Sequence, residues 1–180
     1  KDSVIFIFGV LALASAISKT GLDRRIGMLL LGTSTSLPKM LFIFTPMLAV
    51  TASFLSEHAL TAFIAPILLM VYASGLHAAG IVKDRKLAVV LFLTLTFAAN
   101  MGGPGSPAAG GRNAVMLGIL SDYGIQVSFL QWVKMGLPFV PVAALTVGLY
   151  FYLLSRRGMK VKELNVAAAV LRESKKIGKM

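Results

Sequence analysis

The sequence predicts an all-α integral membrane protein, and both its composition and the arrangement of its apolar residues favour that fold class. Of its 180 residues, 57% are hydrophobic and 14% are charged, whereas a soluble domain carries about 25% charged residues. This number of charged residues is too small to give a globular domain a polar surface. We therefore expect most of the exterior to face a lipid bilayer. The apolar residues gather into five stretches, which are Val4–Ser18, Met40–Leu55, Ala59–Leu76, Leu87–Met101 with a continuation through Leu120, and Met135–Leu154.

The basic residues set the expected orientation. The formal net charge is +11, but the Lys and Arg side chains stand in blocks between apolar stretches, without the aromatic platform or basic stripe of a nucleic-acid-binding protein. Three blocks, within residues 19–39, 83–86 and 156–179, hold most of them, and the positive-inside rule places all three in the cytoplasm. We therefore expect a multi-pass protein of the cell's inner (plasma) membrane, with no nucleic-acid partner. The absence of Cys excludes disulfides and thiolate metal sites.

This orientation divides the chain into five segments. Residues 1–37 are expected to form a transmembrane helix and a cytoplasmic basic loop. Residues 38–76 leave the cytoplasm and return to it, either as a re-entrant helical hairpin or as a tilted pair of full spans. Residues 77–125 form a cytoplasmic loop and a broken transmembrane helix, and residues 126–158 form an outer interfacial helix and the last span. Residues 159–180 form a basic cytoplasmic tail, either helical on the anionic membrane surface or solvated.

Ser56-Glu57-His58 interrupts the apolar pattern between the second and third stretches. If the hairpin is re-entrant, these side chains lie inside the membrane, where a Glu and a His are costly and mark a functional site. Ser56 would then cap a helix starting near Ala59, and the free N–H groups of that helix would attract anions. The alternative is an ordinary exposed turn between two full spans.

Residues 100–113 form the second interruption. They contain five Gly and two Pro, which cannot continue a helix, and apolar sequence lies on both sides. An unwound stretch within a span points to the substrate and ion site of a transporter. Its freed carbonyl groups can coordinate a monovalent cation, the helix beginning near Asn113 offers N–H groups to an anion, and Arg112 can hold carboxylate or sulfate oxygens. The alternative is a turn between two short helices outside the membrane.

The order of these features resembles the divalent anion:sodium symporter family. The resemblance covers nearly the whole chain and rests on the runs Phe8–Ala14 and Lys19–Ile26, the polar hairpin tip followed by Pro66, the broken helix from Gly102-Gly103 to Asn113, and the run Phe129–Pro138. It implies a secondary transporter built from two inverted repeats, of which this chain is similar to the first. It also implies a hairpin re-entrant from the cytoplasm, a second repeat beyond this sequence, and a homodimer.

The resemblance also implies a site, with departures. In the family the hairpin tip carries Ser-Asn-Thr, which contacts the substrate carboxylate and helps to form a sodium site, whereas Glu57 and His58 replace the Asn and Thr here. Glu57 can be a charged cation ligand or a protonatable group, and Arg112 can balance its charge or bind the anion. The implied substrate ligands are Ser56, Glu57, His58, Ser106, Arg112 and Asn113, and the implied cation ligands are Ser53, Ser56, Glu57, Gly103, Pro107 and Asn113.

The function expected from these features is secondary active transport. We expect symport of a small divalent anion, such as a C4-dicarboxylate or sulfate, with Na+ or alternatively H+ as the coupling ion and with no other cofactor. No enzyme is expected, because the sequence holds no nucleophile–base pair and no catalytic motif. The rivals are a non-transporting membrane subunit and an arsenite- or citrate-type carrier of the same superfamily. Because residue 1 is Lys rather than Met, we expect the chain to be part of a longer protein.

Overall fold

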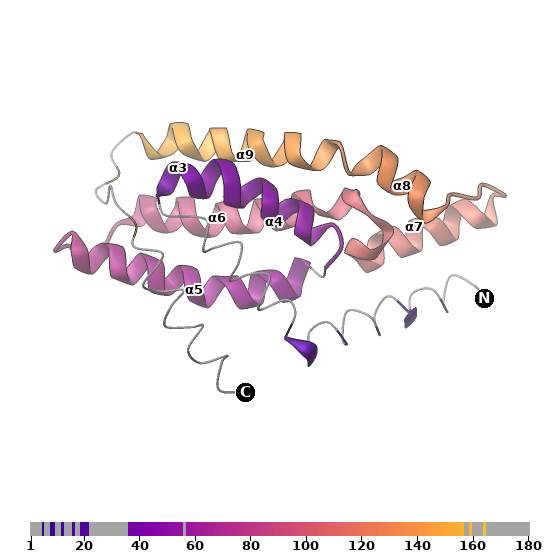
Figure 1. Cartoon of the computed structure of the whole chain (residues 1–180), viewed down its shortest axis with the longest axis horizontal. Coiled ribbons are helices and arrows are strands. Elements are labelled where there is room, and N and C mark those ends of the chain that lie inside the picture. Colours follow the sequence, from indigo (N-terminus) through magenta and orange to yellow (C-terminus); the bar gives the residue numbers. More distant parts are fainter. Residues whose placement is uncertain are drawn as a thin grey trace.

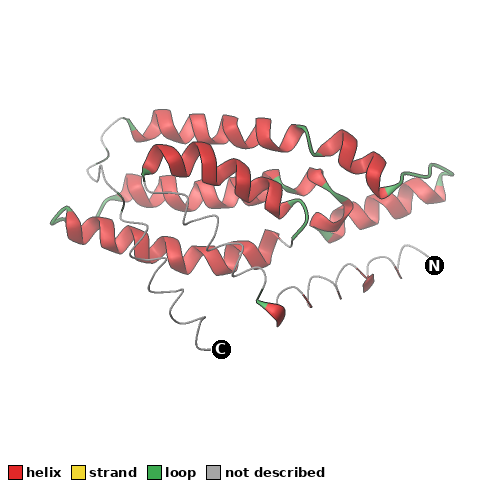
Figure 2. Ribbon diagram, in the orientation of Figure 1, coloured by secondary structure: helices red, strands yellow, loops and turns green. Residues whose placement is uncertain are grey.

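The computed structural model describes residues 36–55 and 57–156, together with 5, 8, 9, 12, 16, 19–21, 159 and 164. Most of the expected first span, Ser56 and most of the basic tail therefore lie outside the described residues. In the two continuous ranges every element is helical (Figure 2), which confirms the all-α class. The elements are α3 (Leu37–Lys39), a π-helical turn (Met40–Phe44), α4 (Thr45–Ala52), α5 (Glu57–Ala78), α6 (Arg85–Met101), two 3-10 turns (Gly103–Gly105 and Pro107–Ala109), α7 (Gly111–Asp122), α8 (Phe129–Gly136) and α9 (Phe139–Ser155).

The long helices lie roughly side by side along one axis of the molecule (Figure 1). α6 packs against α5 and α9, and α4 packs against both α6 and α9. Fully buried side chains at these contacts include Phe44, Leu48, Leu60, Leu68 and Leu91. Within the described residues three helical stretches are long and apolar enough to cross a membrane, namely Leu60–Ala78, Arg85–Gly105 and Phe129–Ser155.

The first arm of the hairpin is shaped by two prolines. Pro38 lies in the first turn of α3, where a missing N–H removes no intrahelical hydrogen bond. Pro46 lies in the first turn of α4, and the turn before it widens into a π-helix in which the Thr45 backbone N–H and side-chain hydroxyl both donate to the Met40 carbonyl. We attribute the wide turn to Pro46, because its ring would clash with the carbonyl four residues earlier in a regular α-helix.

The two arms of the hairpin differ in length. The helical arm Leu37–Ala52 extends for about 24 Å at 1.5 Å per residue, less than the ~30 Å of the hydrocarbon core. α5, in contrast, is long enough to cross. The turn between α4 and α5 lies partway along the long axis of the bundle, beside the break between α6 and α7 (Figure 1). These lengths are compatible with a re-entrant hairpin, which stays a prediction.

The connection from α5 to α6, residues 79–84, is a short turn. Gly80 takes a φ of 65°, a left-handed conformation that glycine adopts without strain, and the Ile81 N–H donates to the Leu76 carbonyl, as at many helix ends. Asp84 then caps α6, because its carboxylate accepts hydrogen bonds from the N–H groups of Lys86 at 3.0 Å and Leu87 at 3.1 Å. The basic block at residues 83–86 therefore stands at one end of the bundle.

The last apolar stretch, Met135–Leu154, is divided between two helices. α8 continues through Gly136 and α9 begins at Phe139, within the helical stretch Phe129–Ser155 that is long enough to cross. The joint falls at Leu137–Pro138, because Pro138 and Pro141 lack the N–H groups that would continue the ladder of α8 into α9. The start of α8 is fixed by a capping box between Ser128 and Gln131.

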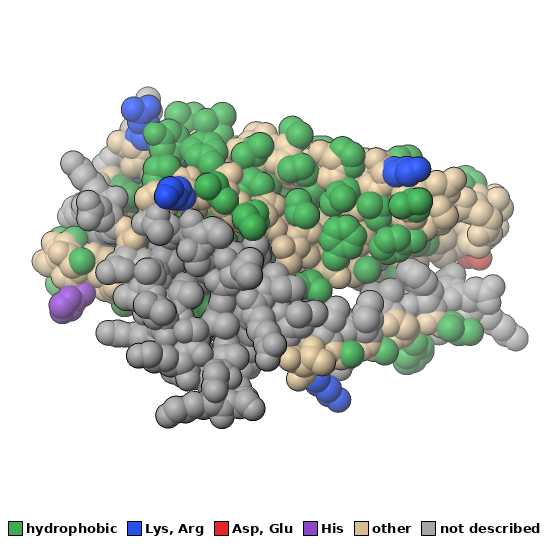
Figure 3. All heavy atoms as spheres, viewed as in Figure 1, with side chains coloured by type: hydrophobic (Ala, Val, Ile, Leu, Met, Phe, Trp, Pro, Cys, Tyr) green, Lys and Arg blue, Asp and Glu red, His purple; other side chains and the backbone are tan. Residues whose placement is uncertain are grey.

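The outer face of α9 is apolar. Its exposed side chains include Phe139, Val142, Leu145, Leu149 and Leu153. Hydrophobic side chains cover much of the face formed by α8 and α9, and the Lys and Arg side chains seen on that face lie toward its ends (Figure 3). A face of this kind suits contact with lipid or with another membrane helix, and it agrees with a multi-pass membrane protein.

Candidate functional site

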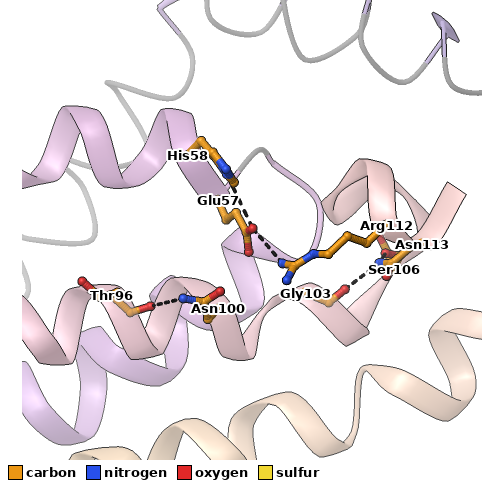
Figure 4. Close-up of polar contacts among 8 residues, drawn as sticks. All are labelled: Glu57, His58, Thr96, Asn100, Gly103, Ser106, Arg112 and Asn113. Carbon is orange, nitrogen blue, oxygen red and sulfur yellow. Dashed lines mark hydrogen bonds and ion pairs between the residues drawn. The ribbon is translucent and has the colours of Figure 1, made fainter. Parts of the chain in front are cut away.

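Two helix N-termini meet at an ion pair. Glu57 is the first residue of α5 and Arg112 is the second residue of α7, and Arg112 Nη2 lies 2.8 Å from Glu57 Oε1 (Figure 4). The helix predicted to start near Ala59 is α5, and it already includes Glu57. The N-terminal end of a helix dipole stabilises a carboxylate and destabilises a cation, so the pairing with Glu57 offsets the unfavourable position of Arg112.

The two partners of this ion pair differ sharply in exposure. The Glu57 side chain is 12% exposed, whereas the Arg112 side chain is 73% exposed. Glu57 Oε2 is buried and has no hydrogen-bond partner among the described residues. His58, whose side chain is 86% exposed, places its Nδ1 3.5 Å from Glu57 Oε1. The site therefore combines a buried carboxylate oxygen with an open guanidinium group.

The carbonyl groups freed by the broken helix are held by side chains. Asn113 Nδ2 donates to the carbonyl oxygens of Gly103 at 2.7 Å and Ser106 at 2.8 Å (Figure 4). Trp132 Nε1, from α8, donates to the carbonyl of Pro104 at 2.9 Å. These bonds supply partners that unwound backbone requires inside a membrane. Because a carbonyl oxygen has two lone pairs, the predicted coordination of a cation by these groups stays open as a prediction.

The hairpin and the broken helix are also joined through buried serines. Ser106 Oγ donates to the Ser53 carbonyl and accepts from the Ala108 N–H at 3.1 Å. Ser53 Oγ donates to the Ala49 carbonyl at 3.1 Å, and both serines are fully buried. A Cβ at Gly105 would overlap with the Ser53 side chain, and one at Gly102 would overlap with the backbone of α4. Both glycines are therefore needed for this close approach.

Most of the predicted site residues lie together. Ser53 and Glu57 from the hairpin stand beside the broken helix, where Gly103, Ser106 and Asn113 are linked by hydrogen bonds and Arg112 reaches Glu57. Pro107 is buried in the second 3-10 turn, His58 lies at the exposed edge, and Ser56 lies outside the described residues. Their roles as ligands remain predictions.

Sequence reasoning missed Trp132, Gly102 and Gly105. Trp132 is the single Trp of the chain, and an indole N–H beside a membrane span needs a hydrogen-bond acceptor. That requirement could have marked Trp132 as a residue that contacts the broken helix. Nothing in the sequence distinguishes Gly102 and Gly105 from Gly110 and Gly111, because all four lie in the same Gly-rich stretch.

We expect Trp132→Phe to weaken the link between α8 and the broken helix. Loss of one hydrogen bond costs about 1 kcal/mol, so the unfolding temperature of the purified full-length protein should fall by a few degrees. Phe129→Leu, on the same helix, is the control and should lower the unfolding temperature less. An equal decrease in the two variants would show that the Trp132 hydrogen bond contributes nothing of its own.

A helical hairpin that meets a broken helix at a polar cluster, inside an all-helical membrane chain, is typical of secondary transporters. The sequence model of the family described as the sodium:sulfate symporter transmembrane region matches residues 1–180. The chain therefore belongs to that family, which is one of transporters, and the resemblance to the divalent anion:sodium symporters is confirmed.

Two curated relatives share this region. The sodium-dependent high-affinity dicarboxylate transporter 3 of Caenorhabditis elegans is 30% identical over 152 residues, which cover 77% of this chain and 27% of the relative. A protein of Cupriavidus necator named only as a membrane protein is 27% identical over 154 residues, covering 84% of this chain and 29% of the relative. The chain thus spans less than a third of the length of either relative. No solved structure matches it significantly.

Proposed function

We propose that the protein containing this chain is a Na+-coupled symporter of a small divalent anion such as a C4-dicarboxylate or sulfate. The observation that carries the proposal is the meeting of Glu57, at the tip of the hairpin, with Arg112, at the start of α7. Membership of the sodium:sulfate symporter family and the activity for which the worm relative is named support the same proposal.

The proposed site divides into an anionic-substrate side and a cation side. Arg112, with its open guanidinium, is the main ligand of the anion, assisted by Ser56, His58, Ser106 and Asn113. The cation side consists of oxygen donors, which suit a hard cation. They are Glu57 and the hydroxyl or carbonyl oxygens of Ser53, Ser56, Gly103, Pro107 and Asn113. The buried Oε2 of Glu57, which has no hydrogen-bond partner in the described part of the chain, fits such a cation.

The coupling follows from charge. A divalent anion entering a membrane site carries a large desolvation cost, which a bound Na+ beside it offsets. Binding of both then favours one arrangement of the hairpin and the broken helix, and movement of the loaded site between the two sides of the membrane gives alternating access. We further propose a plasma-membrane location with the basic loops in the cytoplasm, a second inverted repeat that completes the site, and a homodimeric assembly.

Uptake by proteoliposomes tests the proposal. The full-length protein is reconstituted, and radiolabelled succinate or sulfate is supplied with an inward gradient of Na+, with choline in its place, or with a proton gradient alone. We expect uptake of at least one anion several-fold above protein-free liposomes, and only with Na+. Uptake driven by protons alone would show that H+ rather than Na+ is the coupling ion. No uptake of either anion would contradict the proposed symport and favour a non-transporting subunit.

A further inference from the structure

We infer that Glu57 is a tethered competitor of the transported anion, so that its carboxylate occupies Arg112 in the empty site and is displaced when the anion binds. The inference rests on the proposed function and adds to it a regulation of the same site. It makes the ion pair seen here the resting form of the anion site, with an internal carboxylate in the place of a carboxylate or sulfate group of the substrate.

The geometry of the pair fits an exchangeable ligand. Glu57 Oε1 contacts Nη2 of Arg112 at 2.8 Å, while a guanidinium group has five N–H donors arranged to hold two acceptor oxygens at once. The Arg112 side chain is 73% exposed. An incoming anion can therefore reach Arg112 from the open side before the bond to Glu57 breaks.

The pair is not required to hold the hairpin against the broken helix. Other contacts join the same two elements, because Ser106 Oγ donates to the Ser53 carbonyl and Gly102 and Gly105 lie against α4 without Cβ atoms. A charge pair with one partner so exposed adds little to stability. A role in ligand exchange accounts better for placing the two charges at the junction.

Displacement of Glu57 has a consequence for the cation. Once Arg112 turns to the anion, Glu57 keeps only the imidazole of His58, whose Nδ1 lies 3.5 Å from Oε1, while Oε2 has no hydrogen-bond partner among the described residues. A poorly paired carboxylate at a largely buried position is unfavourable. A cation bound beside Glu57 removes that cost. Anion binding should therefore be weak without Na+ because Glu57 holds Arg112, and Na+ should strengthen it by neutralising the displaced carboxylate.

The test compares the two halves of the pair. Binding of succinate and of sulfate to the purified full-length protein is measured by calorimetry, with Na+ and with choline. In choline, Glu57→Gln should lower the dissociation constant roughly 5-fold relative to the unmodified protein, since the side chain keeps its shape and loses its charge. Its affinity should then depend little on Na+. Arg112→Gln should abolish measurable binding under both conditions.

Two further variants complete the test. Asp122→Asn removes one carboxylate from the exposed end of α7, away from the pair, and should leave both dissociation constants unchanged. Glu57→Asp retains the charge but shortens the side chain by one methylene, so anion binding in choline should strengthen while Na+ still strengthens it further. Elution profiles in size-exclusion chromatography and unfolding temperatures identify any variant that fails to fold. If Glu57→Gln does not fold, the comparison is made with Glu57→Asp.

The outcomes separate the inference from the proposed function. If Glu57→Gln and Arg112→Gln weaken binding alike, the pair is structural and the inference is wrong. An unchanged affinity in Glu57→Gln and in Glu57→Asp also overturns it, while Na+-driven uptake by the unmodified protein leaves the proposed function standing. If the unmodified protein neither binds nor transports the two anions, the proposed function and the inference fall together.

Discussion

Gly105→Ala is expected to reduce transport roughly 10-fold or more and to destabilise the protein by about 1–3 kcal/mol. Gly105 is buried, and an added Cβ would overlap with the Cβ and Oγ of Ser53 and lie 3.1 Å from Cγ2 of Val140. Ser53 cannot easily retreat, because its side chain is fully buried and its hydroxyl donates to the Ala49 carbonyl. The hairpin tip must therefore shift away from the broken helix. Uptake in proteoliposomes and the unfolding temperature measure the two effects.

A neighbouring glycine provides the matched control. Among the described residues no atom lies within 4 Å of a Cβ added at Gly110, and its φ of −176° is extended backbone that any residue adopts. Because Gly110 is the N-cap of α7 and alanine is a poorer N-cap, Gly110→Ala should lose at most about 1 kcal/mol of stability and transport like the unmodified protein. Adding Ser53→Gly to Gly105→Ala removes the atoms that clash and should recover part of the lost unfolding temperature. Full activity and stability in Gly105→Ala alone would show that the hairpin does not need this close contact.

The contrast between these glycines shows how far the sequence could lead. The composition of residues 100–113 predicts that α6 must break, because five Gly and two Pro disfavour a helix wherever they lie. Which glycine supports a contact depends on how α4 and α8 pack against the break. That packing is tertiary, and no local pattern in the sequence encodes it. The break was therefore predictable, whereas the separate roles of Gly105 and Gly110 were not.

The ion pair was predictable in its members and not in its geometry. Glu57 and Arg112 are charges that interrupt apolar sequence, which marks both for function, but they are 55 positions apart. Their meeting depends on α5 including Glu57 and on α7 beginning at Gly111. Helix ends are the least reliable part of a prediction from sequence, and a start two residues later would have left Glu57 in a turn.

Asn113→Asp is the second substitution from which we expect a large decrease in transport. Asn113 Nδ2 donates to two carbonyl oxygens, at 2.7 Å and 2.8 Å. A carboxylate of the same shape only accepts hydrogen bonds, so it would repel both carbonyls and leave them unsatisfied, at a cost of about 1–3 kcal/mol for each buried group. The two 3-10 turns should then open, which lowers both the unfolding temperature and Na+-driven uptake.

Asn113→Ala and Asn100→Ala turn this substitution into a test of what Asn113 does. Asn100 Nδ2 donates to the Thr96 carbonyl within its own helix, so Asn100→Ala should change little. Asn113→Ala loses the two donated bonds without adding charge and should be impaired less than Asn113→Asp. The reverse order would mean that the side-chain oxygen matters more than the amide nitrogen. Retained Na+-driven uptake in Asn113→Asp would then favour a role for Asn113 as a cation ligand. A carboxylate can coordinate Na+, whereas it cannot donate hydrogen bonds to the two carbonyl groups.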